Sequence, residues 1–117
     1  VKALVSNGVI AVCEGANKPI IPEGIKYLLN NKIVYGPCIA ANAGGVATSG
    51  LEMTQNSLHH YWTFEEVDNR LKTIMKTIFG NVLNSAKELN KPHNLYEGAY
   101  VAAFKKICDA MLSQGII

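Results

Sequence analysis

The chain has 117 residues, of which 49% are hydrophobic and 17% are charged, and its formal net charge is +2. This composition is typical of one globular domain or a piece of one, and it excludes a disordered tail. The basic residues are scattered and no apolar run is long enough to cross a bilayer, so we expect neither a nucleic-acid partner nor a membrane segment.

The chain opens on residues 1–6, whose apolar positions have helical spacing, and Asn7 and Gly8 follow. This pair suits a helix C-terminus because glycine adopts the left-handed conformation at low cost. No helix-start signal precedes Val1, so we expect the chain to be the C-terminal part of a larger protein. Residues 9–13 form a continuous β-branched apolar run, which predicts a strand buried on both faces, as in a parallel sheet.

The next segments predict a βαβ unit. Pro22 opens a helical stretch that runs to about Asn30, and proline suits a first-turn position because its missing N–H has no partner there. Residues 33–35 are typical of a second short buried strand, roughly twenty residues after the first, which is enough for a right-handed crossover helix. Together with the helix at residues 1–6, this alternation of helices and strands predicts an α/β doubly wound sheet.

The rest of the chain predicts helices. We expect a loop at 38–42 and helices over about 43–59, 63–90 and 94–115. Thr63 and Glu66 have the spacing of a capping box ahead of the longest of them. Two strands do not make an independent sheet, so we expect these helices to need a partner surface that the chain does not contain.

The cysteines and histidines indicate neither disulfides nor a metal. Cys13, Cys38 and Cys108 are odd in number, far apart and without a CxxC pair. A disulfide framework is therefore not expected, and a reducing, cytoplasmic compartment is the default. No zinc-like ligand spacing occurs, so we expect no metal site.

Two loops follow the carboxyl ends of the predicted strands, where ligands bind in open α/β sheets. The first carries Glu14 and Asn17, and the second carries Asn42. Small neighbouring residues let a flat ligand approach the backbone, and an asparagine amide both donates and accepts hydrogen bonds. A carboxamide and a sugar hydroxyl fit such an amide equally well. The alternative, in which each asparagine only braces its own turn, stays open here.

Other residues could bind a ligand but could equally have a purely structural role. Gly44 and Gly45 ahead of a helix resemble an anion site, for a carboxylate rather than a triphosphate because no phosphate-loop pattern occurs. The Ser49 hydroxyl lies one turn further on, but a helix-interior serine commonly bonds back to its own backbone. Glu14 is interpreted as a helix-dipole or turn-bonding residue rather than an acid or base. Residues 59–62 are interpreted as a linker with an aromatic anchor.

Taken together, these motifs resemble one family. The strings EGAN at 14–17 and NAGGVATSGLEMTQN at 42–56 are similar to the C-terminal part of the hexameric glutamate dehydrogenases. The similarity continues through 62–68 and reaches the final DAMLSQGII. It implies reversible oxidative deamination of L-glutamate to 2-oxoglutarate and ammonium, with NADP or NAD as coenzyme, in a cytoplasmic homohexamer.

The resemblance also implies a division of the chain. Residues 1–58 would be the C-terminal part of a Rossmann-like NAD(P)-binding domain. Residues 59–117 would be C-terminal helices that pack back toward a substrate domain that this chain lacks. The family's catalytic lysine and aspartate have no counterpart here, so no catalytic residue is assigned and the segment alone is expected to be inactive.

Four site residues follow from the resemblance. Asn17 corresponds to an asparagine near the nicotinamide ribose, and Asn42 to one beside the nicotinamide and the substrate. Val46 and Ser49 correspond to residues of the glutamate pocket, where the serine hydroxyl bonds the distal carboxylate. Two alternatives remain: a dehydrogenase for another amino acid, such as leucine or phenylalanine, and a non-catalytic nucleotide-binding or assembly module.

Overall fold

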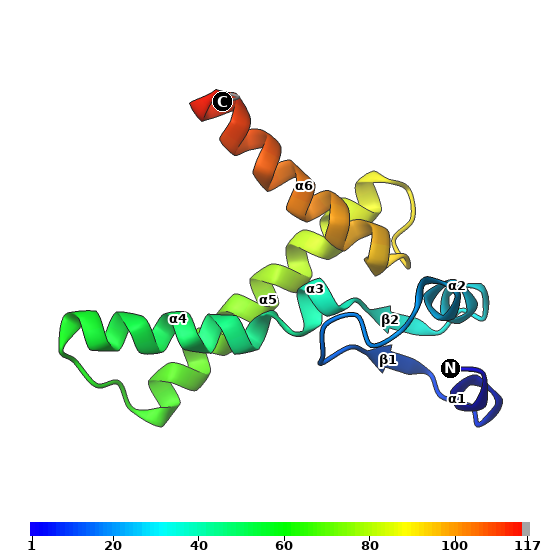
Figure 1. Ribbon diagram of the computed structural model, residues 1–117, viewed down its shortest axis with the longest axis horizontal. Coiled ribbons are helices and arrows are strands. Elements are labelled where there is room, and N and C mark those ends of the chain that lie inside the picture. The colour runs from blue at the N-terminus through cyan, green and yellow to red at the C-terminus, as the bar shows by residue number, and fades with distance from the viewer. Residues whose placement is uncertain (116–117) are drawn as a thin grey trace.

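The computed structural model describes residues 1–115, so the last two residues of the DAMLSQGII string lie outside the described part. Its elements are α1 (Lys2–Ser6), β1 (Ala11–Cys13), α2 (Pro22–Asn30), β2 (Val34–Gly36), α3 (Cys38–Ala41), α4 (Ala43–Leu58), α5 (Phe64–Glu88) and α6 (Leu95–Gln114). The shape is extended rather than spherical (Figure 1). Its radius of gyration is 16.9 Å, against about 13 Å for a compact chain of this length.

The predicted βαβ unit is confirmed. Strands β1 and β2 are parallel neighbours, with Ala11 opposite Val34 and Cys13 opposite Gly36. Helix α2 connects them, and its buried Ile25 and Leu28 form a core cluster with Tyr35 of β2. The chain is therefore α/β, with a small parallel sheet beside α2.

Local sequence explains where α2 begins and ends. Ile21 before it is extended, and Pro22 occupies the first helical turn, as predicted. The helix ends at Asn30, and the left-handed conformation then occurs at Lys32, with φ 57°. The predicted end of this helix at about Asn30 is therefore confirmed.

The predictions of a strand buried on both faces at 9–13 and of a buried strand at 33–35 are wrong in part. β1 covers 11–13 rather than 9–13, and the Ile10 side chain just before it is 82% exposed. Val34 of β2 is also exposed, whereas Tyr35 beside it is buried. The reason is that β1 and β2 pair only with each other in the described residues, and α2 covers only one face.

The loop predicted at 38–42 is also wrong, because Cys38–Ala41 forms the short helix α3. Pro37 before it is extended and supplies the helix entry. The Cys38 N–H donates to the Glu14 carboxylate, 2.9 Å away, so a free donor of the first turn finds a partner. That partner is 24 residues distant in the chain, so local sequence does not indicate this cap.

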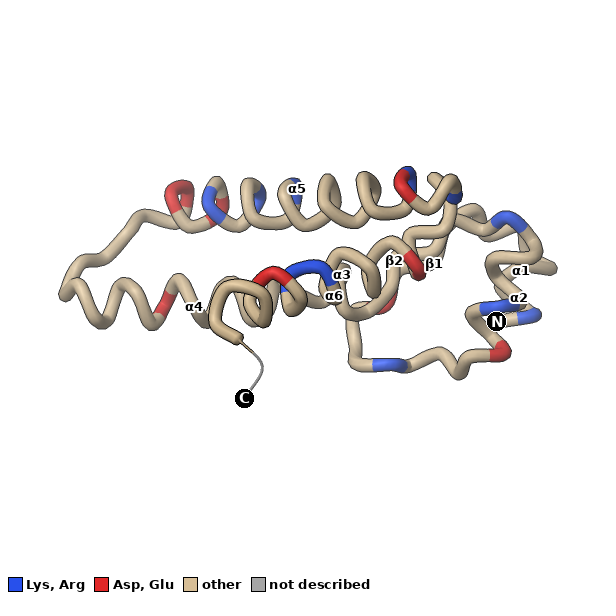
Figure 2. The backbone as a smooth tube through the Cα atoms, turned by 90° about the horizontal axis from the view of Figure 1, so that it is seen from above, with Lys and Arg blue, Asp and Glu red and all other residues tan. Residues whose placement is uncertain are grey.

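The three long helices follow the sequence prediction closely. The Thr63 and Glu66 capping box is present in both directions at the start of α5, and Asn94 caps α6 through Glu97. Helices α4 and α5 run in roughly opposite directions, are joined by 59–63, and cross at an oblique angle (Figure 1). Seen from above, α5 runs along one side of the molecule and α4 and α6 lie on the other (Figure 2).

Helices α5 and α6 approach each other most closely at Gly98. A Cβ added there would lie 2.5 Å from the Val82 carbonyl oxygen and 2.9 Å from Ala86 Cβ. Ser85, Ala86 and Ala99 are buried at the same crossing. Small residues therefore set the distance between the two helices.

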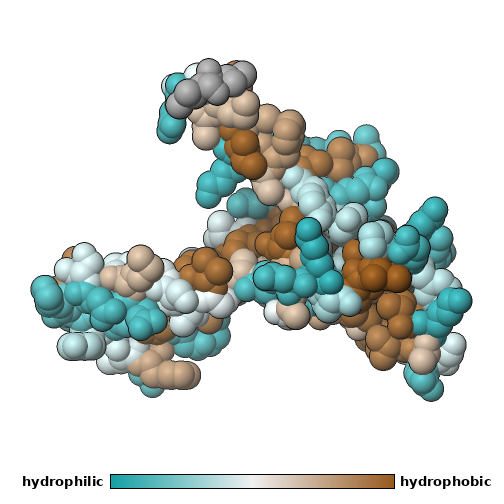
Figure 3. All heavy atoms as spheres, in the orientation of Figure 1, coloured by the Kyte–Doolittle hydropathy of each residue, from teal (hydrophilic) through white to brown (hydrophobic). Residues whose placement is uncertain are grey.

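Many apolar side chains remain exposed, and Figure 3 shows hydrophobic surface around the middle of the molecule. The exposed large apolar residues include Val46, Phe79, Phe104, Ile107 and Leu112. Among residues 1–115, none of the helices has the length and apolar character needed to cross a membrane.

Candidate functional site

The two asparagine-bearing segments start side by side. Cys13 and Gly36 are paired at the last position of the two parallel strands. Beyond them, the Glu14 N–H donates to the Gly36 carbonyl at 3.0 Å. Because the register continues past the strands, the chain leaves the same edge of the sheet twice, as ligand-binding loops do in α/β folds.

The structure brings Asn17 and Asn42 into direct contact. The Asn42 Nδ2 donates to the Asn17 Oδ1 at 2.6 Å, at an exposed position. This bond uses one polar atom of each amide. The Asn17 Nδ2 and the Asn42 Oδ1 have no hydrogen-bond partner within residues 1–115, so the pair presents a donor and an acceptor together. A carboxamide has the complementary groups.

Val46 and Ser49 lie on the same face of α4 as Asn42. They follow it by four and seven residues, which is the spacing of one helix face. Val46 is 79% exposed and its side chain is open to a ligand. Asn17 and Asn42 are thus in contact, and Val46 and Ser49 follow Asn42 at the spacing of one helix face.

The Ser49 hydroxyl also bonds back to the backbone of its own helix, which is the alternative to a ligand-binding role. Its Oγ donates to the Gly45 carbonyl at 3.3 Å, and Thr48 makes the equivalent bond to Gly44 at 2.9 Å. The Ser49 bond is the longer of the two. A hydroxyl in this position keeps its acceptor lone pairs and can rotate toward a ligand.

The two glycines of this segment have different surroundings. A Cβ on Gly44 would meet the Met75 sulfur at 3.5 Å and the Leu71 Cδ1 at 3.7 Å, so this position faces α5. A Cβ on Gly45 would have nothing within 4 Å. The Gly45 N–H donates to the Asn42 carbonyl at 3.2 Å, so it is already occupied. Packing explains Gly44, and the anion-site interpretation stays a prediction.

Glu14 is the centre of a buried polar network. Its carboxylate accepts hydrogen bonds from the Tyr35 hydroxyl at 2.5 Å, the Cys38 N–H at 2.9 Å and the Ile20 N–H at 3.2 Å. Burial alone raises the pKa of Glu14, but these hydrogen bonds to the charged form outweigh it and lower the pKa below its usual value. The side chain is 3% exposed and remains an ionised acceptor. The bond to the first turn of α3 agrees with the interpretation of Glu14 as a helix-dipole or turn-bonding residue, although Tyr35 and Cys38 are distant from it in the chain.

Tyr35 is the buried donor of this network. Burial and the neighbouring Glu14 raise the pKa of its hydroxyl far above the usual value, so the proton stays on the tyrosine. The ring stacks at an angle against Tyr96 of α6, with ring centres 6.1 Å apart. Sequence reasoning missed Tyr35 as a site residue, although a tyrosine at a buried strand position was a signal, because a buried hydroxyl needs a partner.

The segment at 59–62 is a linker, as interpreted. His59 ends α4 in the left-handed conformation, with φ 51°. The Trp62 N–H donates to the Gln55 Oε1 at 2.6 Å, and the Arg70 guanidinium lies 4.1 Å from the Trp62 ring centre. These contacts make Trp62 an anchor between α4 and α5.

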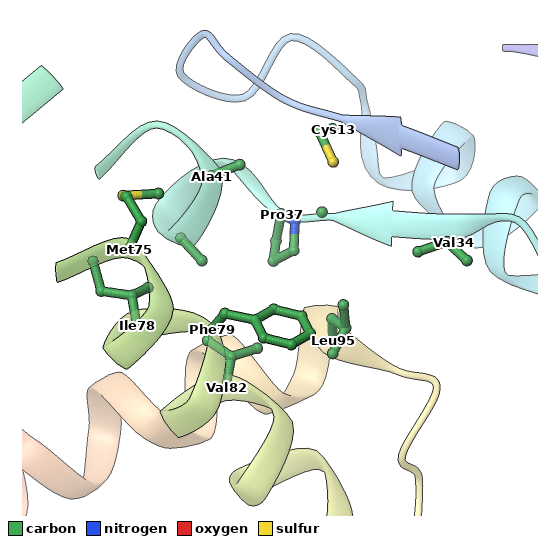
Figure 4. Close-up of a pocket in the computed structure, with 11 residues that line it drawn as sticks. Cys13, Val34, Pro37, Ala41, Met75, Ile78, Phe79, Val82 and Leu95 are labelled. Atoms are coloured by element: carbon green, nitrogen blue, oxygen red, sulfur yellow. The ribbon is translucent and has the colours of Figure 1, made fainter. Parts of the chain in front are cut away.

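An apolar cavity of about 240 Å³ lies between the strand ends and α5. In Figure 4, Met75, Ile78 and Phe79 of α5 face Cys13 and Pro37 on the sheet side. Its walls are almost entirely hydrophobic, so it offers packing surface rather than chemical groups. Within residues 1–115, no three potential metal ligands gather at one point.

Comparisons with known proteins give the context of this site. A model of the Glutamate/Leucine/Phenylalanine/Valine dehydrogenase family matches residues 1–115. The NADP-specific glutamate dehydrogenase of Helicobacter pylori is 51% identical over 98% of the chain, and so is the NAD(P)-specific glutamate dehydrogenase of Xylanibacter ruminicola. The crystal structure of Plasmodium falciparum glutamate dehydrogenase matches 99% of the chain with a TM-score of 0.92 and 44% identity.

The chain spans about a quarter of the length of these proteins, 26% of both bacterial relatives and 25% of the Plasmodium chain. The family match covers almost every residue, including both asparagine segments and all three long helices. The chain belongs to the Glutamate/Leucine/Phenylalanine/Valine dehydrogenase family.

Proposed function

We propose that the chain is the C-terminal segment of a glutamate dehydrogenase subunit, and that the whole subunit catalyses the reversible oxidative deamination of L-glutamate to 2-oxoglutarate and ammonium. The observation that carries the proposal is the contact of Asn42 with Asn17 at the sheet edge. It occurs in a chain that is 51% identical, along nearly its full length, to proteins named glutamate dehydrogenase. NADP or NAD is the coenzyme, since the names of these relatives include both.

In this proposal the two amides orient the coenzyme. The Asn17 Nδ2 and the Asn42 Oδ1 match the acceptor and donor of the nicotinamide carboxamide and the hydroxyls of its ribose. The nicotinamide ring supplies the hydride chemistry when it is bound. What this chain adds is orientation, because hydride transfer requires the reacting carbons to be held in a fixed geometry.

Val46 and Ser49 form part of the substrate wall. Val46 presents an exposed apolar side chain one turn beyond Asn42, which suits the aliphatic stem of glutamate. The Ser49 hydroxyl, further along the same face, donates to the distal carboxylate. The reacting end of glutamate then lies near Asn42, and its far end lies near Ser49.

The division of the chain follows from the same proposal. Residues 1–58 contribute the last part of a Rossmann-like coenzyme domain, and residues 59–117 return as helices toward the substrate domain of the same subunit. The exposed apolar side chains of β2, α5 and α6 support this, because they need covering surface. The whole subunit assembles as a homohexamer, and the segment by itself is inactive.

The test is a substrate panel on the complete subunit. Initial rates with L-glutamate, L-leucine and L-phenylalanine are measured with NADP and with NAD, and the 117-residue chain is assayed in parallel. We expect activity with glutamate from the subunit and none from the chain. Higher kcat/KM for leucine or phenylalanine would assign the chain to another amino-acid dehydrogenase. Absence of activity, with tight coenzyme binding by the isolated chain, would identify a nucleotide-binding module.

A further inference from the structure

The Glu14 carboxylate joins three parts of the chain that are separate in sequence. One oxygen, Oε1, accepts the Ile20 N–H, and the other, Oε2, accepts the Tyr35 hydroxyl and the Cys38 N–H. The side chain is almost fully buried, whereas the contact between the two asparagines is exposed. It makes no hydrogen bond to either asparagine, so any effect on them is indirect.

Each backbone bond of Glu14 fixes one asparagine-bearing segment. The bond to Ile20 closes the loop of residues 14–20, and Asn17 lies in the middle of that loop. The bond to Cys38 holds the first turn of α3, and α3 leads directly to Asn42. A single carboxylate is thus the shared attachment point of both segments.

The third bond fixes the carboxylate itself. The Tyr35 ring belongs to the core cluster with Ile25 and Leu28, and it is 1% exposed. Its hydroxyl therefore has a position set by packing, from which it donates to Glu14 at 2.5 Å. The orientation of Glu14 is determined by the hydrophobic core, and the two segments take their positions from Glu14.

We propose that Glu14 is a positioning residue of the coenzyme site, which holds the Asn17 and Asn42 amides at the spacing that the nicotinamide half of the coenzyme requires. This inference rests on the proposed function. It goes beyond it by assigning a role to a residue that contacts neither coenzyme nor substrate.

Glutamine cannot replace Glu14 in this network. A glutamine side chain has one acceptor oxygen and one NH₂ donor in place of two acceptor oxygens. With its oxygen toward Tyr35 and Cys38, the NH₂ faces the Ile20 N–H. In the reversed orientation, the NH₂ faces the Cys38 N–H. Either orientation sets a donor against a backbone donor, so one of the two segments must move.

The variants are made in the complete subunit. Glu14→Gln disturbs one backbone bond, and Tyr35→Phe removes only the hydroxyl that orients the carboxylate. Val82→Ala is the matched control, since Val82 is a buried apolar residue of α5 that belongs neither to the Glu14 network nor to the core cluster of Tyr35. It lowers stability without changing the polar network.

The readout separates positioning from stability. For each variant we measure kcat, the KM for the coenzyme, and the Kd of an adenine-only fragment (2′,5′-ADP or 5′-AMP) that lacks the nicotinamide half. We expect Glu14→Gln to lower kcat/KM for the coenzyme by about 10- to 100-fold with an unchanged fragment Kd. Tyr35→Phe should give a smaller loss of the same kind. Val82→Ala should lower the melting temperature and leave both constants unchanged.

Hydrogen–deuterium exchange supplies a second arm that does not depend on activity. We expect faster amide exchange in peptides covering 17–20 and 38–42 in Glu14→Gln, and unchanged exchange there in Val82→Ala. If the wild-type subunit does not oxidise glutamate, the proposed function fails, and this arm still decides whether Glu14 holds the loops. The inference is overturned if Glu14→Gln matches Val82→Ala in coenzyme KM and in loop exchange. If Glu14→Gln does not fold, the same comparison is made with Tyr35→Phe.

Discussion

The sheet edge and the helical arms of this molecule are held together in different ways. At the sheet edge, Leu28 and Tyr35 are completely buried and the one buried carboxylate among residues 1–115, Glu14, has all its bonds within the chain. Along α6, by contrast, Phe104 is 65% exposed and Leu112 is 85% exposed. The first region is therefore determined internally, whereas the second has its helices but little of the packing that such helices need.

The two regions therefore differ in how far this chain alone determines their structure. The position of Asn17 relative to Asn42 depends on bonds and core contacts inside the βαβ unit, so the chain itself specifies it. The direction of α6 depends largely on its crossing with α5, where Gly98 lies, and on the contact of Tyr96 with Tyr35 at its start. Substitutions in the two regions should therefore have different effects on stability and on kinetics. The predicted effects run from the largest to the smallest.

Gly98→Ala should have the largest effect, in the helical region. The added methyl group would lie 2.5 Å from the Val82 carbonyl oxygen, and a backbone atom cannot rotate away. We expect a loss of about 3 kcal/mol in the free energy of unfolding of the complete subunit, the upper end of overpacking effects. Denaturant titration measures it.

Gly80→Ala is the matched control for this change. It lies in α5, and a Cβ there would have nothing within 4 Å. Replacing a helical glycine with alanine should raise stability by about 0.5–1 kcal/mol. Equal effects of the two substitutions would mean that the α5–α6 crossing does not determine the position of α6.

Tyr35→Phe should have the next largest effect, in the sheet-edge region. It removes a hydrogen bond to an ionised carboxylate, which is worth about 2 kcal/mol. The pKa of Glu14 lies below its usual value of 4.5, so the ionised carboxylate stabilises the fold above that pH. This contribution is lost as the pH falls through the pKa that Glu14 has in the folded state.

The difference between wild type and Tyr35→Phe should therefore be largest at neutral pH and should shrink below about pH 4.5. Urea titrations of the complete subunit at several pH values give this difference directly. A difference that stays constant down to about pH 3, well below the usual range of a glutamate, would show that the lost hydroxyl acts by packing and not through Glu14.

Most of the fold could be predicted from local sequence because its signals are local. Pro22, the Thr63–Glu66 box and the Asn94 cap each determine a helix start within a single turn, and the structure has all three helices. Helix α3 could not be predicted, because its cap is Glu14 from a distant segment. The burial of the strands was also mispredicted, since an apolar run indicates a strand that needs covering but not whether this chain covers it.

The two asparagine loops of the candidate site could be predicted from the sequence, but the Glu14 network that holds them could not. The two loops at neighbouring strand ends, each with an asparagine, follow from the general rule for α/β sheets, and the contact of Asn17 with Asn42 agrees with it. The network behind them depends on Tyr35, a core residue by pattern. Nothing in the spacing of Glu14 and Tyr35, 21 residues apart, indicates that they meet.

Ser49→Ala tests whether α4, like the sheet edge, contributes to ligand binding. If the Ser49 hydroxyl binds the distal carboxylate of glutamate, its loss should raise the KM for glutamate about tenfold, as expected for a hydrogen bond to a charged group. The KM for norvaline, which lacks that carboxylate, should not change. Steady-state kinetics of the complete subunit with both substrates measure the difference.

Thr54→Ala is the control on the same helix. Its hydroxyl also donates to a backbone carbonyl four residues earlier, that of Gly50, at 2.8 Å. It therefore tests the loss of such a bond away from the proposed pocket, and we expect both KM values to stay unchanged. If Ser49→Ala weakens glutamate and norvaline equally, the Ser49 hydroxyl serves α4 and not the substrate.

Thr63→Ala should have the smallest effect and should separate helix formation from helix packing. The Thr63 Oγ1 accepts the Glu66 N–H at 3.2 Å, and the Glu66 carboxylate accepts the Thr63 N–H at 2.7 Å. Loss of such a cap costs about 1 kcal/mol, and Thr77→Ala, which removes an exposed hydroxyl within α5, should change stability by less than about 0.5 kcal/mol. Because the buried residues of α5 lie at its far end, at the α6 crossing, its start depends on this cap. A Thr63→Ala effect no larger than that of Thr77→Ala would mean that tertiary contacts, rather than the local sequence, hold the beginning of α5.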